Sequence, residues 1–149
     1  SKIKKIFCVP ELSYTTFGLM SCNNDDDSGN SNEEKILGTW KLEKIVYQEE
    51  GEKDEVYFPD NCEKKSTTTY NADKTYKTDE YSENSNTNTC ENEIYGGKYS
   101  IENGYLIDHE EEAKLKIQEI SSNKMLLVGE EDYNSDGKID YKIIATFIK

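Results

Sequence analysis

Hydrophobic and polar positions begin to alternate at Thr39, after a long polar stretch of the chain. Trp40 and Leu42 share one face of this segment, and charged side chains follow each of them on the other face. A repeat of two residues is the period of a β-strand that buries one face. The alternation changes parity before Ile45, which predicts a β-bulge near Lys44 and hence a bent first strand.

The same alternation recurs in short segments separated by turn residues, such as the Asn103-Gly104 pair that is typical of tight hairpins. Charged or polar loops are predicted at residues 49–61, which hold an apolar cluster at 56–59, and at residues 83–92. The further strands are predicted at 64–70, 75–81, 94–101, 105–108, 113–118, 125–128 and 139–148. A set of about eight strands with short connections indicates an all-β domain, either an up-and-down barrel or a sandwich.

The N-terminal segment has the features of a secretory signal peptide. Residues 1–21 begin with lysines and apolar side chains and end with small residues. The run Leu19-Met20-Ser21-Cys22 resembles the lipobox of bacterial lipoproteins, in which the cysteine sulfur takes diacylglycerol and becomes the new N-terminus. We therefore predict lipidation of Cys22 and attachment to a membrane through that lipid. The alternative is an ordinary buried cysteine after an amphipathic segment.

A polar, acidic tether follows the cysteine. Residues 22–32 lack core-forming side chains, so the folded domain is predicted at residues 33–149. Within the tether, Asp25-Asp26-Asp27 resembles the acidic export signal of surface-displayed lipoproteins of the Bacteroidota. The alternative is a spacer whose carboxylates only keep it solvated. The predicted location is the outer membrane, with the domain facing the periplasm or the cell surface.

The four cysteines match no zinc signature in their spacing. Removal of the signal peptide takes Cys8 away, and lipidation occupies Cys22. Cys62 and Cys90 then remain as one pair, and a disulfide between them suits an exported protein. The alternative is two free thiols.

The charge of the chain excludes one class of partner. Acidic residues number 31 against 18 basic ones, for a net charge of -13, and every basic residue is a lysine. The chain therefore lacks the arginine fork that binds phosphate in two places, and its charge repels polyanions. Nucleic acid is not a predicted partner.

Residues 36–42, which read Ile-Leu-Gly-Thr-Trp-Lys-Leu, resemble the opening G-x-W strand of lipocalins. Three further segments extend the likeness to the lipocalin-like lipoproteins of the Bacteroidota: residues 60–64, 70–76 and 97–101. The similarity covers roughly residues 33–149 and implies an eight-stranded antiparallel up-and-down barrel. It also implies a barrel floor at Gly38 and Trp40 and a small apolar ligand. It implies no reaction.

The 11 tyrosines offer apolar rings with polar tips, which suit the wall of a binding cavity. The predicted ligand-binding residues are Tyr70, Tyr76, Tyr99, Tyr105 and Tyr141. The alternative is that these tyrosines only form strands and fill the core, because an eight-stranded barrel holds one small ligand or none. Two functions follow: a lipoprotein that binds a small hydrophobic or amphipathic molecule, or a filled barrel whose acidic loops contact a protein or glycan.

One acidic segment resembles a calcium-binding loop, with oxygen ligands at its first, third, fifth and ninth positions and Gly137 at the sixth. Its candidate ligands are Asp132, Asn134, Asp136 and Asp140. The twelfth position, where such loops carry glutamate, is Ile143, and Glu130 or Glu131 would have to substitute. The prediction is a structural calcium ion, and the alternative is a plain hairpin turn.

No residue pattern indicates catalysis. The sole histidine, His109, lies in a hydrophilic turn, and no serine or cysteine pairs with it in a recognisable nucleophile motif. The protein is therefore not predicted to be an enzyme.

Overall fold

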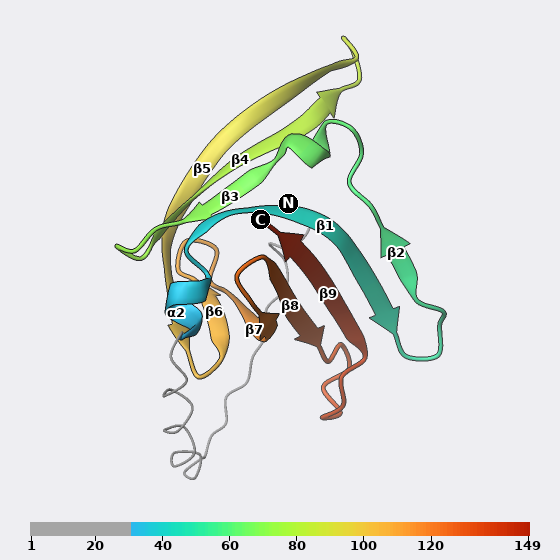
Figure 1. Cartoon of the computed structure of the whole chain (residues 1–149). Coiled ribbons are helices and arrows are strands. Elements are labelled where there is room, and N and C mark those ends of the chain that lie inside the picture. Colours follow the sequence, from blue (N-terminus) through green and yellow to red (C-terminus); the bar gives the residue numbers. More distant parts are fainter. Residues whose placement is uncertain (1–30) are drawn as a thin grey trace.

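The computed structural model describes residues 31–149, and β-strands dominate this part of the chain (Figure 1). A short helix, α2 (Asn32–Lys35), precedes the strands, and a 3-10 turn, η2 (Glu63–Lys65), lies between the second and third of them. The strands are β1 (Gly38–Glu49), β2 (Glu55–Tyr57), β3 (Thr67–Tyr70), β4 (Thr75–Asn84), β5 (Thr89–Glu102), β6 (Tyr105–Asp108), β7 (Ala113–Ile120), β8 (Lys124–Glu131) and β9 (Tyr141–Ile148). The predicted signal peptide, Cys22 and nearly all of the tether lie outside the described residues.

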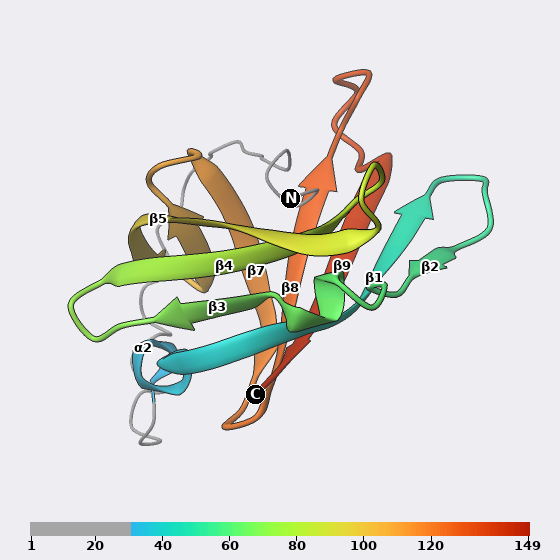
Figure 2. The same ribbon diagram turned by 90° about the horizontal axis from the view of Figure 1, so that it is seen from above.

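Eight of these strands form a closed antiparallel barrel. They follow one another in the order β1-β3-β4-β5-β6-β7-β8-β9, and β9 pairs with β1 to close the ring. Seen from above, β3, β4 and β5 cross steeply over β7, β8 and β9, so the barrel has two faces of nearly perpendicular strands (Figure 2). The up-and-down barrel predicted from the sequence is therefore confirmed.

The first strand belongs to both faces of the barrel. Its N-terminal residues pair with β3, and residues 41–49 pair with β9 along the opposite edge. The register of the β1–β9 pair shifts between Leu42 and Lys44, which confirms the predicted bulge. Because the bulge changes the parity of the strand, Trp40 and Ile45 are both buried.

Connections alternate between the two ends of the barrel, because every strand is antiparallel to its neighbour. One end, called here the closed end, carries α2, the turns 71–74, 103–104 and 121–123, and Lys149. The other end, called here the open end, carries the segments 50–66, 85–88, 109–112 and 132–140.

The hairpin of β4 and β5 is longer than the alternation predicts. Residues 83–92 were predicted to be a polar loop, but Glu83 pairs with Cys90 and Asn84 pairs with Thr89. The prediction was wrong because this end of the hairpin extends past the barrel and both of its faces meet solvent (Figure 1). Polar residues then occupy both faces, and the strand shows no alternation. The disulfide between Cys62 and Cys90 is confirmed, and it ties the segment before β3 to this hairpin.

Several further boundaries differ from the prediction, among them the start of the strand predicted at 64–70, where η2 precedes β3. Residues 55–57, within the predicted loop 49–61, form β2 and pair with residues 45–47 of β1. The last strand begins at Tyr141, and Ile139 is 46% exposed in the preceding loop. Backbone N–H groups of that loop donate to the Asp140 carboxylate, which holds the chain in a turn up to β9.

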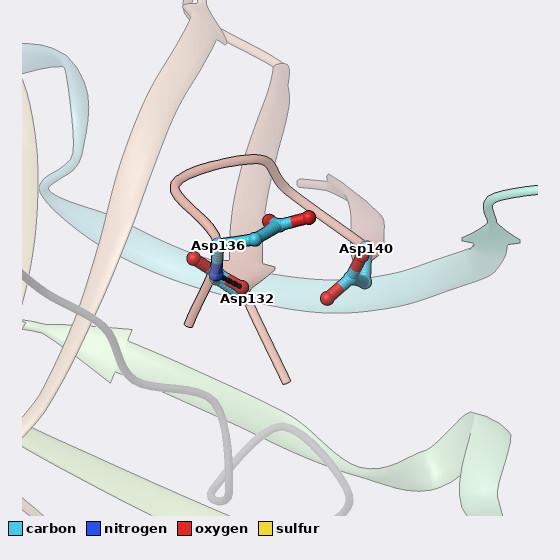
Figure 3. Close-up of side chains that lie close together, drawn as sticks. All are labelled: Asp132, Asp136 and Asp140. Atoms are coloured by element: carbon cyan, nitrogen blue, oxygen red, sulfur yellow. Dashed lines mark hydrogen bonds between the residues drawn. The ribbon is translucent and has the colours of Figure 1, made fainter. Parts of the chain in front are cut away.

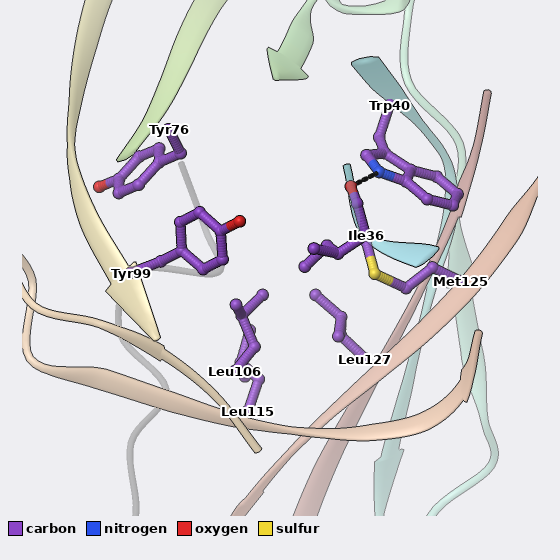
Figure 4. Packing of buried hydrophobic residues seen from close by; sticks show 8 residues of the cluster. All are labelled: Ile36, Trp40, Tyr76, Tyr99, Leu106, Leu115, Met125 and Leu127. Atoms are coloured by element: carbon purple, nitrogen blue, oxygen red, sulfur yellow. Dashed lines mark hydrogen bonds between the residues drawn. The ribbon is translucent and has the colours of Figure 1, made fainter. Parts of the chain in front are cut away.

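The buried side chains gather at the closed end and along the barrel interior (Figure 4). The cluster consists of Ile36, Trp40, Tyr76, Tyr99, Leu106, Leu115, Met125 and Leu127. Among residues 31–149, no helix is both long and apolar enough to cross a membrane.

Candidate ligand-binding cavity

The closed end of the barrel is sealed by Trp40, which is only 1% exposed. Its indole N–H donates to the carbonyl of Ile36 at 2.7 Å and so fixes the segment after α2 (Figure 4). The ammonium of Lys149 lies 4.8 Å from the centre of the indole ring and donates to the carbonyl of Leu37 at 2.7 Å. Gly38 has a φ of +117°, and a Cβ there would lie 3.2 Å from the Lys149 side chain. Both predicted floor residues thus lie at the closed end.

Above this floor the barrel encloses a cavity of about 400 Å³. Its apolar wall is contributed by Trp40, Leu42, Ile45, Leu106, Ala113, Leu115, Leu127 and Phe147. A volume of this size lies in the range of small-molecule sites, roughly 300–1,000 Å³. The interior therefore has room for a compact apolar molecule.

Three of the predicted tyrosines meet on one wall of the cavity. The ring of Tyr70 stands edge-on to that of Tyr99, with centroids 5.0 Å apart, and lies 6.1 Å from the ring of Tyr76. The Tyr76 hydroxyl donates to the Asp108 carboxylate at 2.8 Å, and the Tyr99 hydroxyl donates to the Asn71 carbonyl at 2.9 Å. The three rings form an aromatic wall, which we call the tyrosine cluster.

The other two predicted tyrosines do not line the cavity. Tyr105 precedes the inward-facing Leu106 on β6, so the two-residue period turns its ring outward, where the Lys114 ammonium lies 4.7 Å from the ring centre. Tyr141 has the parity of inward residues, but it lies where β9 begins, beyond the cavity. Its ring contacts those of Tyr47 and Tyr133, with centroids 6.3 and 5.7 Å away.

The structure adds lining residues that the sequence analysis did not single out. Tyr57 donates to the Glu63 carboxylate, and Tyr95 donates to the Glu80 carboxylate at 2.8 Å. Tyr95 lies four residues before Tyr99 on the same face of β5. The two-residue period of the strand could therefore have predicted that Tyr95 also faces the cavity. The carboxylates carried no such signal, because acidic residues are frequent throughout the chain.

Burial keeps three tyrosines of this wall protonated. It raises the pKa of Tyr70, Tyr76 and Tyr95 above the ordinary value, because an enclosed phenolate loses hydration. For Tyr76 and Tyr95 the hydrogen bond to a carboxylate raises the pKa further, since only the protonated hydroxyl can donate. Tyr76 and Tyr95 therefore act as neutral donors.

The predicted calcium loop lies between β8 and β9, outside the cavity. Carboxylate oxygens of Asp132, Asp136 and Asp140 come within 4.8 Å of one another (Figure 3). The fourth predicted ligand, Asn134, accepts the backbone N–H of Asp136 at 3.0 Å. Position twelve of the pattern, Ile143, packs against the core and offers no ligand. The three carboxylates match the oxygen donors that calcium prefers, and each has a second oxygen or lone pair beyond its backbone bond.

The exposed histidine is on the outer surface. The imidazole Nε2 of His109 lies 2.9 Å from the Ser100 hydroxyl, and that hydroxyl also donates to Glu102 at 2.9 Å. Ser100 follows the inward-facing Tyr99, so the pair lies on the opposite face of the strand. None of the three residues lines the cavity.

Comparison with known proteins identifies the family. The family described as "Lipocalin-like domain" matches residues 36–127, which is more than half of the chain. A solved structure titled "Bovine Odorant Binding Protein deswapped triple mutant" is 13% identical, with 77% of this chain and 74% of that chain covered and a TM-score of 0.38. No curated protein is similar enough to count as a match. The chain therefore belongs to the family of lipocalin-like domains.

Proposed function

We propose that this protein is a cell-envelope lipoprotein whose barrel binds a small hydrophobic or amphipathic molecule without catalysis. The observation that carries the proposal is the cavity of about 400 Å³, with an apolar wall, between a sealed closed end and the loops of the open end. The alternative, a filled barrel that acts only as an interaction module, requires side chains to occupy this space. The cavity therefore favours ligand binding over that alternative.

Two observations support binding without catalysis. Lipocalin-like domains are generally binding proteins, and this chain belongs to that family. The cavity wall carries tyrosines and carboxylates, three of the tyrosines donate to carboxylates, and the histidine lies outside. A general base needs a positioned partner beside a bound substrate, and His109 has no cavity beside it.

The location rests on the N-terminal sequence. The lipobox-like run before Cys22 supports a diacylglycerol anchor, and the acidic residues behind it support the outer membrane, facing the periplasm or the cell surface. The disulfide between Cys62 and Cys90 is in keeping with an oxidising compartment outside the cytoplasm.

A structural calcium ion in the loop 132–140 forms a separate part of the proposal. The three clustered carboxylates and Asn134 would hold it, and the ion would stiffen the β8–β9 hairpin. The loop does not line the cavity, so the ion would have no part in ligand binding.

Native mass spectrometry of the protein extracted from its own membrane tests both the ligand and the anchor. We expect a retained small molecule, together with diacylglycerol on Cys22. In the Ala113→Phe variant, a larger side chain at the cavity wall should displace the molecule. The matched control is Ala72→Phe, in an exposed turn at the closed end, which should keep it.

Equal retention of the molecule by the two variants, with both melting near the wild-type temperature, would place the ligand outside the barrel. Repeated spectra of wild-type protein without any bound molecule would count against ligand binding altogether. A mature protein whose Cys22 carries no lipid would end the proposal of an anchor, independently of the ligand.

A further inference from the structure

The wall of the cavity toward the open end is acidic. Its carboxylates are Glu63, Glu80, Asp108 and Glu111, and none of the described residues that line the cavity is a lysine or a histidine. Lysine is nevertheless common in the chain, with 18 residues in all. Lys77, Lys98 and Lys114 lie on strands of the barrel and are exposed to solvent. These strand lysines thus face outward, whereas the strand carboxylates Glu80 and Asp108 face the cavity.

Two of these carboxylates are held only by neutral donors. Asp108 accepts the hydroxyl of Tyr76 at 2.8 Å and the backbone N–H of Glu110 at 2.9 Å. Glu63 accepts the hydroxyl of Tyr57 and the backbone N–H of Asp60. A neutral donor brings no positive charge to a carboxylate, so it does not compensate the negative charge. Within residues 31–149 the ion pairs are Lys74–Glu33 and Lys142–Glu130, and neither lies in the cavity wall.

The tyrosine cluster lies directly beneath one of these charges. Tyr76 contributes its ring to the cluster and its hydroxyl to Asp108, so the aromatic surface and the carboxylate are adjacent. The hydroxyl of Tyr70, in the same wall, makes no hydrogen bond with any described residue. The cavity thus combines an apolar floor, aromatic faces, an unpaired hydroxyl and negative charge.

We propose that the cavity selects a small amphipathic cation, with its apolar body on the floor and an ammonium group beside Asp108 and Glu63. This inference rests on the proposed ligand-binding function and names the chemical class of the ligand. An ammonium group donates charge-assisted hydrogen bonds to the carboxylates. It is also attracted to the faces of the tyrosine rings. An anionic amphiphile of the same shape would bring a like charge into a wall of low dielectric, which disfavours it.

Three probes that differ only in the head group test the selection. Binding of decylammonium, decanol and decanoate to the full chain is measured by isothermal titration calorimetry at low salt. We expect decylammonium to bind about tenfold or more tightly than decanol, which corresponds to one charge-assisted hydrogen bond, and decanoate to bind most weakly. The preference for decylammonium over decanol should shrink at high salt, because salt screens charges near the solvent-exposed open end.

Isosteric variants assign the preference to the wall. Asp108→Asn combined with Glu63→Gln should weaken decylammonium binding toward that of decanol, while decanol itself binds as before. The matched control Glu52→Gln removes a charge from the exposed β1–β2 turn outside the cavity and should leave all three affinities unchanged. Retained decanol binding shows that the double variant is folded.

The outcomes separate the inference from the function it rests on. If decanol or decanoate binds as tightly as decylammonium, the cationic selection is wrong and the ligand-binding function stands. The same holds if the double variant keeps the full preference for decylammonium. If none of the three probes binds, the ligand-binding function itself is contradicted.

Discussion

At the scale of single residues, Trp40 connects three parts of the chain. Its indole N–H holds the carbonyl of Ile36, its ring faces the Lys149 ammonium, and its strand opens the barrel. The segment that follows α2 and the side chain of Lys149 therefore meet on one side chain. A smaller ring without a donor at this position would lose contact with both.

We expect Trp40→Phe to lower the free energy of unfolding by about 2–4 kcal/mol, from the smaller buried volume and the unpaired Ile36 carbonyl. Urea denaturation measures this difference. Lys149→Met keeps an apolar stem but removes both the cation–π contact and the hydrogen bond to the Leu37 carbonyl, and should cost about 1–2 kcal/mol. A Trp40→Phe variant within 0.5 kcal/mol of wild type would show that the indole does not seal the barrel.

The same side-chain type has different roles at different positions. Tyr76 and Tyr105 were predicted to be equivalent, yet one donates to a carboxylate in the cavity and the other lies beneath a lysine outside. The difference is the parity of the strand, which the sequence contains: Leu106 is the inward residue on β6, so its neighbour cannot also face inward. Tyr141 has the right parity but lies past the cavity. Its position along the barrel relative to the cavity depends on tertiary structure alone.

At the scale of elements, the strands that bury one face were predictable, and those that bury none were not. β1 and β7 alternate clearly because water covers one face and the core covers the other. The end of the β4–β5 hairpin has water on both faces, so hydrophobic and polar residues do not alternate in that part of the sequence. In the loop 132–140 the spacing of Asp132, Asp136 and Asp140 grouped them as one ligand set, and their carboxylates do come together in the folded hairpin.

The proposed calcium ion makes a testable prediction for this hairpin. An ion that binds only the folded state raises the melting temperature, and for a site with millimolar to submillimolar affinity the rise should be about 5 °C or more at 10 mM calcium. Differential scanning calorimetry with calcium and with a chelator measures it. Asp136→Asn should abolish the rise, whereas the matched loss of one charge in Glu52→Gln, in the β1–β2 turn, should not. A melting temperature indifferent to chelator rules the ion out.

At the scale of the whole molecule, closure of the barrel creates the candidate site. Glu63 precedes β3 and Asp108 ends β6, so 45 positions separate two carboxylates of one cavity wall. No local pattern marks them among the 31 acidic residues of the chain. The barrel and its floor followed from alternation and from the G-x-W resemblance. The charge inside the cavity depends on which of the acidic side chains face inward once the barrel has closed.

The enclosed tyrosines also make the stability of the whole barrel sensitive to alkali. The pKa of Tyr70, Tyr76 and Tyr95 is raised in the folded state above 10.0, because burial disfavours the phenolate. The unfolded chain releases these protons near pH 10, whereas the folded barrel keeps them. Above that pH the unfolded state therefore binds fewer protons, and the free energy of unfolding falls as the pH rises.

We expect full stability from these tyrosines below about pH 10 and a progressive loss between about pH 10 and pH 12. Urea denaturation at a series of pH values measures the loss, and absorbance at 295 nm reports ionisation of the phenols. Tyr76→Phe should flatten the decline, because one proton fewer is then released on unfolding. Complete ionisation of all tyrosines while the near-ultraviolet circular dichroism of the folded barrel persists would contradict the enclosure of these side chains. Ionisation that coincides with unfolding is the behaviour expected of tyrosines that are buried in the wall of the barrel.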